Sequence, residues 1–255
     1  MDITNQIALV TGAGSGLGEA TARHFAQLGA KVVILDFDKE RGDAVASDIG
    51  GISIQTDVAD AGSVEAGFAT AIKTLGSAPR IAVNCAGIGP AARIVGREGK
   101  LSTELFERTI QVNLLGTYYV MSHAARGMQG LEPMNEDGER GVIINTASVA
   151  LEDGQLGQSA YSASKGAIAS LCLPAAREFA QTGIRVMTIA PGLFQTPMME
   201  GLPEETTAKI TANIPYPARL GQPSEYARLA SDIVANPFLN GTTIRLDGAV
   251  RLPPR

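Results

Sequence analysis

The residues whose types and spacing could do chemistry are Tyr161 and Lys165, four positions apart, with Ser148 thirteen positions before Tyr161. On an α-helix this four-residue step puts the phenol and the ammonium on one face, about one turn apart. A cation about 4 Å away would lower the phenol pKa from near 10 by roughly three units, enough to make it a useful base near neutral pH. A nearby serine hydroxyl could hold the substrate oxygen. The three residues predict alcohol oxidation and ketone reduction.

A tyrosine–lysine pair at this spacing also occurs by chance on exposed helix faces, so the catalytic interpretation needs independent support. A glycine-rich turn near the N-terminus gives that support. Residues 6–10 form a short apolar run typical of a buried parallel strand, and an amphipathic stretch runs over residues 19–28. Between them, glycines would let the backbone approach a pyrophosphate while free helix N–H groups face the anion. The strict G-x-G-x-x-G spacing is not met. The turn residues expected at the cofactor are Gly12, Ser15, Gly16, Leu17 and Gly18.

A carboxylate at the end of the second apolar run indicates which dinucleotide binds. Residues 31–35 read as a strand, and Asp36 follows it, eighteen positions after Gly18. An acidic side chain there accepts hydrogen bonds from the adenosine ribose and repels a 2′-phosphate. The glycine turn holds no arginine or lysine, and neither Phe37 nor Asp38 is basic. The sequence therefore favours NAD over NADP.

Composition narrows the remaining possibilities. The chain has 255 residues, a net charge of −5 and two cysteines. The net negative charge and the lack of a stripe of basic residues argue against nucleic-acid binding. Two distant cysteines predict neither a metal site nor a disulfide framework, and they indicate a reducing compartment. Without a basic leader or an apolar run approaching 18 residues, we expect no membrane association and a cytoplasmic protein.

Strands alternate with helical patterns along the whole chain, as βαβ units require. We therefore expect one α/β domain over residues 1–255, with a Rossmann-type doubly wound parallel sheet of about seven strands and helices on both faces. In such sheets ligands lie beyond the carboxyl ends of the strands. The strands are expected at residues 6–10, 31–35, 52–56, 80–84, 142–146, 185–190 and 242–246.

Taken in order, the motifs resemble those of the short-chain dehydrogenase/reductase family over essentially the whole chain. Within it the chain is most similar to the 3-hydroxyacyl-CoA dehydrogenases of type 2, a group also known as 17β-hydroxysteroid dehydrogenases. Longer runs carry this closer resemblance, at residues 141–149, 183–194, 236–241 and 244–249. The family motifs are the glycine turn, Asp36, Asn84-Cys85-Ala86-Gly87, Asn113, Ser148, Tyr161, Lys165 and Pro191-Gly192.

The resemblance implies a role for each matching residue. Tyr161 would be the general base, and Lys165 would hold the nicotinamide ribose and lower the tyrosine pKa. Ser148 would position the reacting oxygen, and Asn113 would maintain a water path that returns the proton to solvent. Around the adenine, the adenosine ribose and the carboxamide, the implied cofactor contacts are Asp57, Val58, Asn84, Cys85, Ala86, Gly87, Pro191, Gly192, Phe194 and Thr196.

Other reactive side chains carry no catalytic prediction. Cys85 is interpreted as packing beside the cofactor, because no histidine is available to activate it as a nucleophile. His24 and His123 are isolated on helical patterns and are interpreted as packing or surface residues. Ser148 lies outside a G-x-S-x-G motif, so it is not read as a nucleophile.

The resemblance implies a 3-hydroxyacyl-CoA as substrate, oxidised reversibly to the 3-ketoacyl-CoA. Arg93, Arg97 and Lys100 crowd one loop and could meet the phosphates of coenzyme A, although a solvated basic loop without a ligand explains them equally well. Gln155 could bond the thioester or the 3-oxygen. A hydroxysteroid or another secondary alcohol stays open as the substrate, and so does a non-catalytic NAD-binding scaffold.

A substrate loop is expected at about residues 194–217, where Met198, Met199 and Leu202 could line an adaptable acyl pocket. The family resemblance further implies a homotetramer. The tail, residues 250–255, is too rich in proline to form a helix, and we expect it to cross to a neighbouring subunit.

Overall fold

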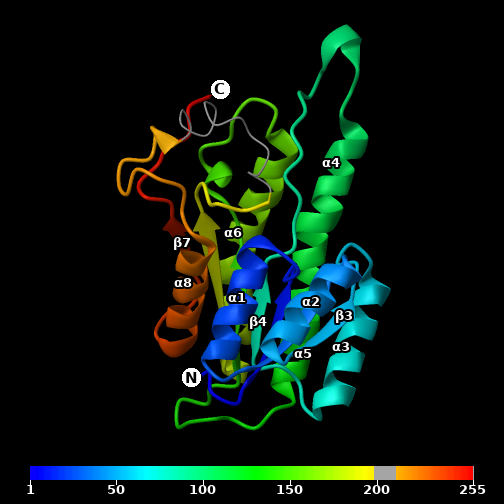
Figure 1. Ribbon diagram of the computed structural model, residues 1–255, viewed down its shortest axis with the longest axis vertical. Helices are drawn as coiled ribbons and strands as arrows, with labels where there is room; N and C mark the ends of the chain where they lie inside the picture. The colour runs from blue at the N-terminus through cyan, green and yellow to red at the C-terminus, as the bar shows by residue number, and fades with distance from the viewer. Residues whose placement is uncertain (198–210, 255) are drawn as a thin grey trace.

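A computed structural model describes residues 1–197 and 211–254, and its centre is one seven-stranded parallel sheet in the order β3-β2-β1-β4-β5-β6-β7 (Figure 1). This order confirms the predicted doubly wound α/β fold, and each strand begins and ends within one residue of its predicted bounds. The strands are β1 (Ile7–Thr11), β2 (Lys31–Asp36), β3 (Ile52–Gln55), β4 (Ile81–Asn84), β5 (Gly141–Thr146), β6 (Ile184–Pro191) and β7 (Thr243–Leu246).

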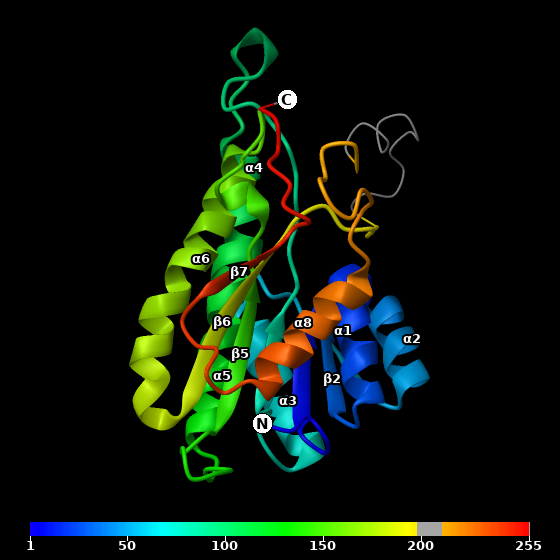
Figure 2. The ribbon, with the colours of Figure 1, turned by 90° about the vertical axis from the view of Figure 1, so that its left-hand side faces the viewer.

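Helices cover both faces of the sheet, which explains why its central strands are apolar on both sides. One face carries α1 (Gly16–Gln27), α2 (Lys39–Ile49) and α8 (Pro223–Ala235), and α1 packs closely on α8. The other carries α3 (Ala61–Leu75), α4 (Thr103–Ile110), α5 (Gly116–Gln129) and α6 (Ser159–Phe179). Figure 2 shows the two groups on opposite sides of the strands.

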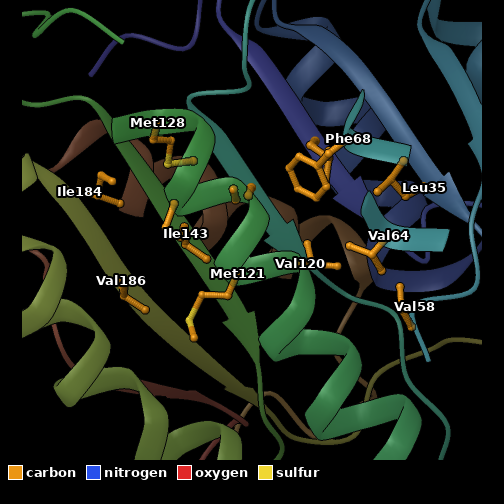
Figure 3. Packing of buried hydrophobic residues seen from close by; sticks show 14 of the residues in the cluster. Leu35, Val58, Val64, Phe68, Val120, Met121, Met128, Ile143, Ile184 and Val186 are labelled. Carbon is orange, nitrogen blue, oxygen red and sulfur yellow. The ribbon is translucent and has the colours of Figure 1, made fainter. Parts of the chain in front are cut away.

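Successive side chains along each strand point to opposite faces of the sheet, so the hydrophobic core consists of two clusters, one on each face. Leu9 belongs to the apolar cluster beneath α3, α5 and α6, whereas Val10 belongs to the cluster beneath α1, α2 and α8. Figure 3 shows part of the first cluster, where Phe68 of α3 and Met128 of α5 lie over the sheet with Ile143 of β5. Packing on both faces holds the sheet in place, so the side chains that follow its strand ends have fixed positions.

The strand order reverses between β1 and β4, so the loops that follow these two strands diverge and leave a crevice at their carboxyl ends. At this edge α4 and α5 continue into each other through a π-helical turn, Gln111–Leu115. A long segment before α4 projects from the body of the molecule, closed by an antiparallel bridge between Val95 and Leu101 (Figure 1). None of the helices in the described ranges is long and apolar enough to cross a bilayer.

The C-terminal segment after β7 is not helical, as predicted, and its crossing to a neighbouring subunit stays a prediction. Through Pro254 it runs back along the loop before α6 of its own chain. The backbone N–H of Leu156 donates to Pro254 O at 3.0 Å, and Gln155 Nε2 donates to Pro253 O at 3.0 Å. Both donors belong to the loop before α6, and both acceptors belong to the C-terminal segment of the same chain.

Candidate active site

The glycine turn between β1 and α1 is shaped by backbone contacts that only glycine permits. Gly12 has φ +63°, in the left-handed region, and a Cβ there would lie 2.8 Å from Ala86 Cα. A Cβ on Gly18 would collide with the carbonyl oxygen of Gly12. Ser15, the N-cap residue of α1, makes no side-chain capping bond, so the first-turn amides of α1 are left for another acceptor. The turn fits a pyrophosphate, as predicted.

Asp36 lies against this turn at the end of β2. Its Oδ2 accepts a hydrogen bond from Gly14 N at 2.7 Å, and its Oδ1 accepts one from Asp38 N at 2.9 Å. Arg41, which the sequence interpretation did not consider, also borders Gly14, and its Nε pairs with Asp38 Oδ2 at 3.3 Å. The Asp36 carboxylate is thus fixed in place, and the Arg41 guanidinium beside the turn is already paired with Asp38.

The end of β4 forms the second wall of the crevice. Thr11 Oγ1 accepts hydrogen bonds from the backbone N–H groups of Cys85 and Ala86, both at 3.1 Å, which ties β1 to the loop after β4. Gly87 lies where two functional groups converge, because a Cβ there would be 3.2 Å from Asn113 Oδ1 and 3.5 Å from Lys165 Nζ. Without a side chain at this position, the crevice stays open toward Lys165.

Not every strand-end residue points into the crevice. Asn84 is buried, and its Nδ2 donates to Asn145 Oδ1 at 2.9 Å within the sheet. Val58 packs against Gly116 at the start of α5, and the Asp57 carboxylate accepts from Ala59 N at 2.9 Å. Contacts from Asn84 and Val58 to a cofactor would therefore come from backbone atoms, whereas Asp57 keeps a second carboxylate oxygen for one.

The segment after β6 closes the crevice on the side of α1. Pro191 ends β6, and Gly192 N donates to Leu246 O at 2.9 Å. Thr196 lies over the glycine turn, since its Cγ2 is 3.5 Å from where a Gly16 Cβ would be. The buried Phe194 ring packs on Gly221, where a Cβ would lie 2.8 Å from the ring. Met198, Met199 and Leu202 lie outside the described residues.

Ser148, Tyr161 and Lys165 come together at the mouth of the crevice. Ser148 follows β5 and is the N-cap of a short 3-10 turn, Val149–Leu151, accepting from Ala150 N at 3.2 Å. Its hydroxyl lies beside the phenol of Tyr161, where hydrogen bonding to the phenolate form lowers the tyrosine pKa. Lys165 Nζ lies 5.7 Å from the centroid of the Tyr161 ring and donates to Thr146 O at 2.8 Å. The grouping predicted from residue spacing therefore exists in space.

The electrostatics of this group differ from the expectation. Burial raises the pKa of Tyr161 above its ordinary value, and the Ser148 hydrogen bond opposes this only in part. Burial also lowers the pKa of Lys165 to about 8, with the nearby Cys85 acting in the opposite direction. The predicted lowering of the tyrosine pKa by Lys165 is therefore wrong for the cofactor-free protein, because the same burial drives both groups toward their neutral forms.

Asn113 occupies the π-helical turn between α4 and α5. Its Oδ1 accepts from Ile88 N at 2.8 Å, and its Nδ2 donates to Ile88 O at 2.9 Å and to Ser164 Oγ at 3.0 Å. Ser164 in turn donates to Tyr161 O at 2.7 Å. The side chain of Asn113 thus fastens the loop after β4 to the catalytic helix, which explains a polar residue fully buried in a helix interior.

The predicted substrate residues lie farther out. Arg93, Arg97 and Lys100 are exposed on the projecting segment before α4. Gln155 is engaged with the C-terminal segment, as described above. A cavity of about 420 Å³ separates the stretch Ala92–Ile94 from the loop Gly154–Gly157, but neither Ser148 nor Tyr161 lines it.

Two residues at the site, Thr146 and Tyr226, were not expected from the sequence. Thr146, at the end of β5, supplies the carbonyl for Lys165, and its strand-end position could have marked it. Its hydroxyl lies 2.6 Å from the phenol of the fully buried Tyr226, and Cys85 Sγ lies 3.7 Å from that phenol. Burial raises the pKa of the Cys85 thiol, which agrees with packing and not with a nucleophile. Within the described ranges no cluster of His, Cys, Asp and Glu could hold a metal ion.

A parallel sheet with a glycine cradle at its switch point, and a serine, tyrosine and lysine grouped beside it, defines a dinucleotide-dependent dehydrogenase. The sequence matches the short chain dehydrogenase family over residues 6–207, and the chain belongs to this family. It is therefore an oxidoreductase that uses a nicotinamide cofactor.

Relatives in sequence and in structure agree with this assignment. The chain is 47% identical to human 3-hydroxyacyl-CoA dehydrogenase type-2 over 252 residues, which cover 97% of this chain and 96% of the relative. A crystal structure of 3-hydroxyacyl-CoA dehydrogenase type-2 from Mycobacterium avium superimposes with a TM-score of 0.91 at 42% identity, covering 98% of both chains. The 3-ketoacyl-(acyl-carrier-protein) reductase from Brucella melitensis, solved in complex with NADH, superimposes with a TM-score of 0.84 at 29% identity, covering 97% of this chain and 98% of the other.

Proposed function

We propose that the protein oxidises the secondary hydroxyl of a 3-hydroxyacyl-CoA to the 3-ketoacyl-CoA with NAD, and runs the reverse reduction. The observation that carries this proposal is the grouping of Ser148, Tyr161 and Lys165 in a chain almost half identical, over nearly its whole length, to dehydrogenases named for this substrate. A place in fatty acid metabolism follows from that substrate. A scaffold without turnover would not require all three side chains to converge.

The chemistry divides between side chains and cofactor. The Ser148 hydroxyl holds the substrate oxygen beside the phenol, and Tyr161 Oη takes the hydroxyl proton during oxidation and returns it during reduction. A bound nicotinamide would supply the acceptor for the hydride of the carbinol carbon, and the positive charge of its oxidised form would favour the phenolate. Lys165 holds the nicotinamide ribose, and Asn113 helps to keep a path by which the proton reaches solvent.

The fit of the crevice to NAD rests on features of the chain itself. At Gly12 and Gly18 the cradle has no room for side chains, and Gly16 has a left-handed φ of +57° that favours glycine. Asp36 presents a fixed carboxylate at the end of β2. This carboxylate would accept from the adenosine ribose and exclude a 2′-phosphate. The remaining proposed contacts are Ser15, Leu17, Gly18, Asp57, Val58, Asn84, Cys85, Ala86, Gly87, Tyr161, Lys165, Pro191, Gly192, Phe194 and Thr196.

The test is a spectrophotometric assay of NADH formation with short-chain 3-hydroxyacyl-CoA, run beside a 17β-hydroxysteroid and a simple secondary alcohol. We expect the acyl-CoA to have the highest kcat/KM. A higher value for the steroid would replace the proposed substrate while keeping the chemistry. Absence of turnover with every alcohol, together with measurable NAD binding, would favour a scaffold.

We also propose that the protein is a cytoplasmic homotetramer and that residues 1–255 act as one domain, with a substrate loop at about 194–217. Large apolar side chains exposed on α4, α5 and α6 support assembly through these helices; they are Phe106, Tyr118 and Leu173. Light scattering coupled to size-exclusion chromatography would measure the mass. Four times the chain mass is expected, and a monomer would exclude the tetramer.

A further inference from the structure

Arg245 of β7 reaches across to the loop that joins Ser148 to the catalytic helix. Its Nη1 donates to Glu152 Oε2 at 2.6 Å and its Nη2 to Asp153 Oδ2 at 2.8 Å, so the guanidinium forks between two consecutive carboxylates. Its Nε donates to Asp247 Oδ2 at 2.9 Å, and this bond fixes the orientation of the guanidinium. The Arg245 side chain is 19% exposed and that of Asp153 is 13% exposed, so solvent screens this contact only partly.

The C-terminal segment holds the same loop a few residues further on. After β7, Arg245 Nη2 also donates to Val250 O at 3.2 Å, and residues 250–254 then run alongside the loop (Figure 2). Pro253 O and Pro254 O accept from Gln155 Nε2 and Leu156 N, both at 3.0 Å. Both oxygens belong to prolines, whose fixed φ angles stiffen the segment that presents them.

We propose that Arg245 and the C-terminal segment, residues 250–254, form a clamp that positions the loop between Ser148 and Tyr161 for substrate turnover. Arg245 is in this sense a positioning residue, because it reaches the reaction only through Glu152 and Asp153. The inference rests on the proposed roles of Ser148 and Tyr161.

The loop needs such a clamp because its two ends have unequal support. Ser148 emerges from the rigid end of β5, whereas Tyr161 stands in the first turn of α6, directly after the loop. On the side away from the clamp, the loop meets the segment before α4 through a hydrogen bond from Ala92 N to Gly157 O at 2.9 Å. Releasing the clamp would let residues 152–156 shift relative to β5, and small displacements of catalytic groups cost large factors in rate.

Three variants test the clamp. Arg245→Lys keeps the charge but cannot fork between two carboxylates. Truncation after Leu252 removes both proline acceptors and leaves Arg245 in place. Arg23→Lys is the matched control, because Arg23 of α1 also bonds two carboxylates, Glu19 Oε1 and Asp48 Oδ2, and neither belongs to the loop or to the C-terminal segment. The readouts are kcat/KM for the alcohol, the Kd for NAD, and amide hydrogen exchange at Leu156.

We expect Arg245→Lys and the truncation each to lower kcat/KM by about tenfold or more with an unchanged Kd for NAD. The truncation should also speed amide exchange at Leu156, while Arg23→Lys behaves like the wild type. Unchanged kcat/KM in both clamp variants, or an equal loss in Arg23→Lys, would overturn the inference. The comparison uses whichever secondary alcohol the wild type oxidises, so a wrong substrate assignment does not affect it. Activity in Tyr161→Phe would instead refute the proposed function.

Discussion

Lys165 holds its ammonium 5.7 Å from the centre of the Tyr161 ring and gives a hydrogen bond to the backbone of Thr146. In the cofactor-free protein the amine therefore stands near the phenol without bonding to it. Because both side chains are buried, the tyrosine pKa lies above its usual value and the lysine pKa lies near 8. Near neutral pH the phenol is therefore protonated, and Lys165 keeps its proton less firmly than an exposed lysine.

Replacing the base tests the central assignment. Tyr161→Phe removes only the phenolic oxygen, so we expect kcat to fall by about a hundredfold to ten-thousandfold while the Kd for NAD stays unchanged. NADH formation and NAD titration measure the two quantities. Tyr118→Phe, on the exposed face of α5, is the matched control and should keep full activity. Substantial turnover by Tyr161→Phe would mean that another group takes the proton.

The two reaction directions should respond to pH in opposite ways. Oxidation requires the phenolate, and burial raises the pKa of Tyr161 in the free enzyme. We therefore expect kcat/KM for oxidation to increase through neutral into alkaline pH, and kcat/KM for reduction to decline only at alkaline pH. Initial rates across pH in both directions measure this. An oxidation profile already flat at neutral pH would show that the phenol is ionised there.

Lys165 should destabilise the cofactor-free fold at neutral pH. Its folded pKa of about 8 lies below the ordinary 10.5, so the unfolded chain binds more protons between these values. The free energy of unfolding should rise as pH goes from about 8 to 10.5, and the full cost below pH 8 is about 3 kcal/mol. Lys165→Met removes this cost but leaves Thr146 O without its donor, a loss of about 1 kcal/mol.

Urea unfolding of the cofactor-free proteins at pH 7 and at pH 10.5 separates these effects. We expect Lys165→Met to be more stable than the wild type at pH 7, by about 2 kcal/mol, and no more stable at pH 10.5. The same stability difference at both pH values would show that the lysine keeps its ordinary pKa when buried.

Asp36 should control the choice of dinucleotide. Asp36→Ala removes the carboxylate that would repel a 2′-phosphate, and it leaves the Arg41 guanidinium, which is paired with Asp38, beside the vacated space. We expect the KM for NAD to rise about tenfold. The preference for NAD over NADP, measured as the ratio of their kcat/KM values, should decrease or reverse. Asp43→Asn, an exposed acidic residue of α2, is the control. An unchanged ratio of kcat/KM for the two cofactors would exclude Asp36 as the determinant.

The basic residues of the projecting segment should act on the coenzyme A headgroup alone. Changing Arg93, Arg97 and Lys100 together to alanine should raise the KM for acyl-CoA and spare a headgroup-free alcohol, because only the former carries phosphates. A control triple of exposed residues elsewhere removes the same charge: Lys31, Lys73 and Arg126. Equal effects on both substrates would refute the contact.

The sequence predicted the fold because each strand is a short apolar run bounded by turns, and it predicted the catalytic group because helical spacing fixes Tyr161 relative to Lys165. Local patterns could not reveal contacts between distant segments. Arg245 meets Glu152 and Asp153 over more than ninety positions, and Tyr226 reaches Thr146 from α8. The sign of the tyrosine pKa shift was missed for the same reason, since burial depends on the whole fold.

The contact between Gly18 and the carbonyl of Gly12 has a consequence for how a cofactor arrives. Because close backbone contacts and the Asp36 carboxylate set this turn, its amides are already oriented before any anion enters. Association should therefore need little reordering of the first βα connection, and a single added methyl group at either glycine would misalign the amides far more than it would unfold the protein.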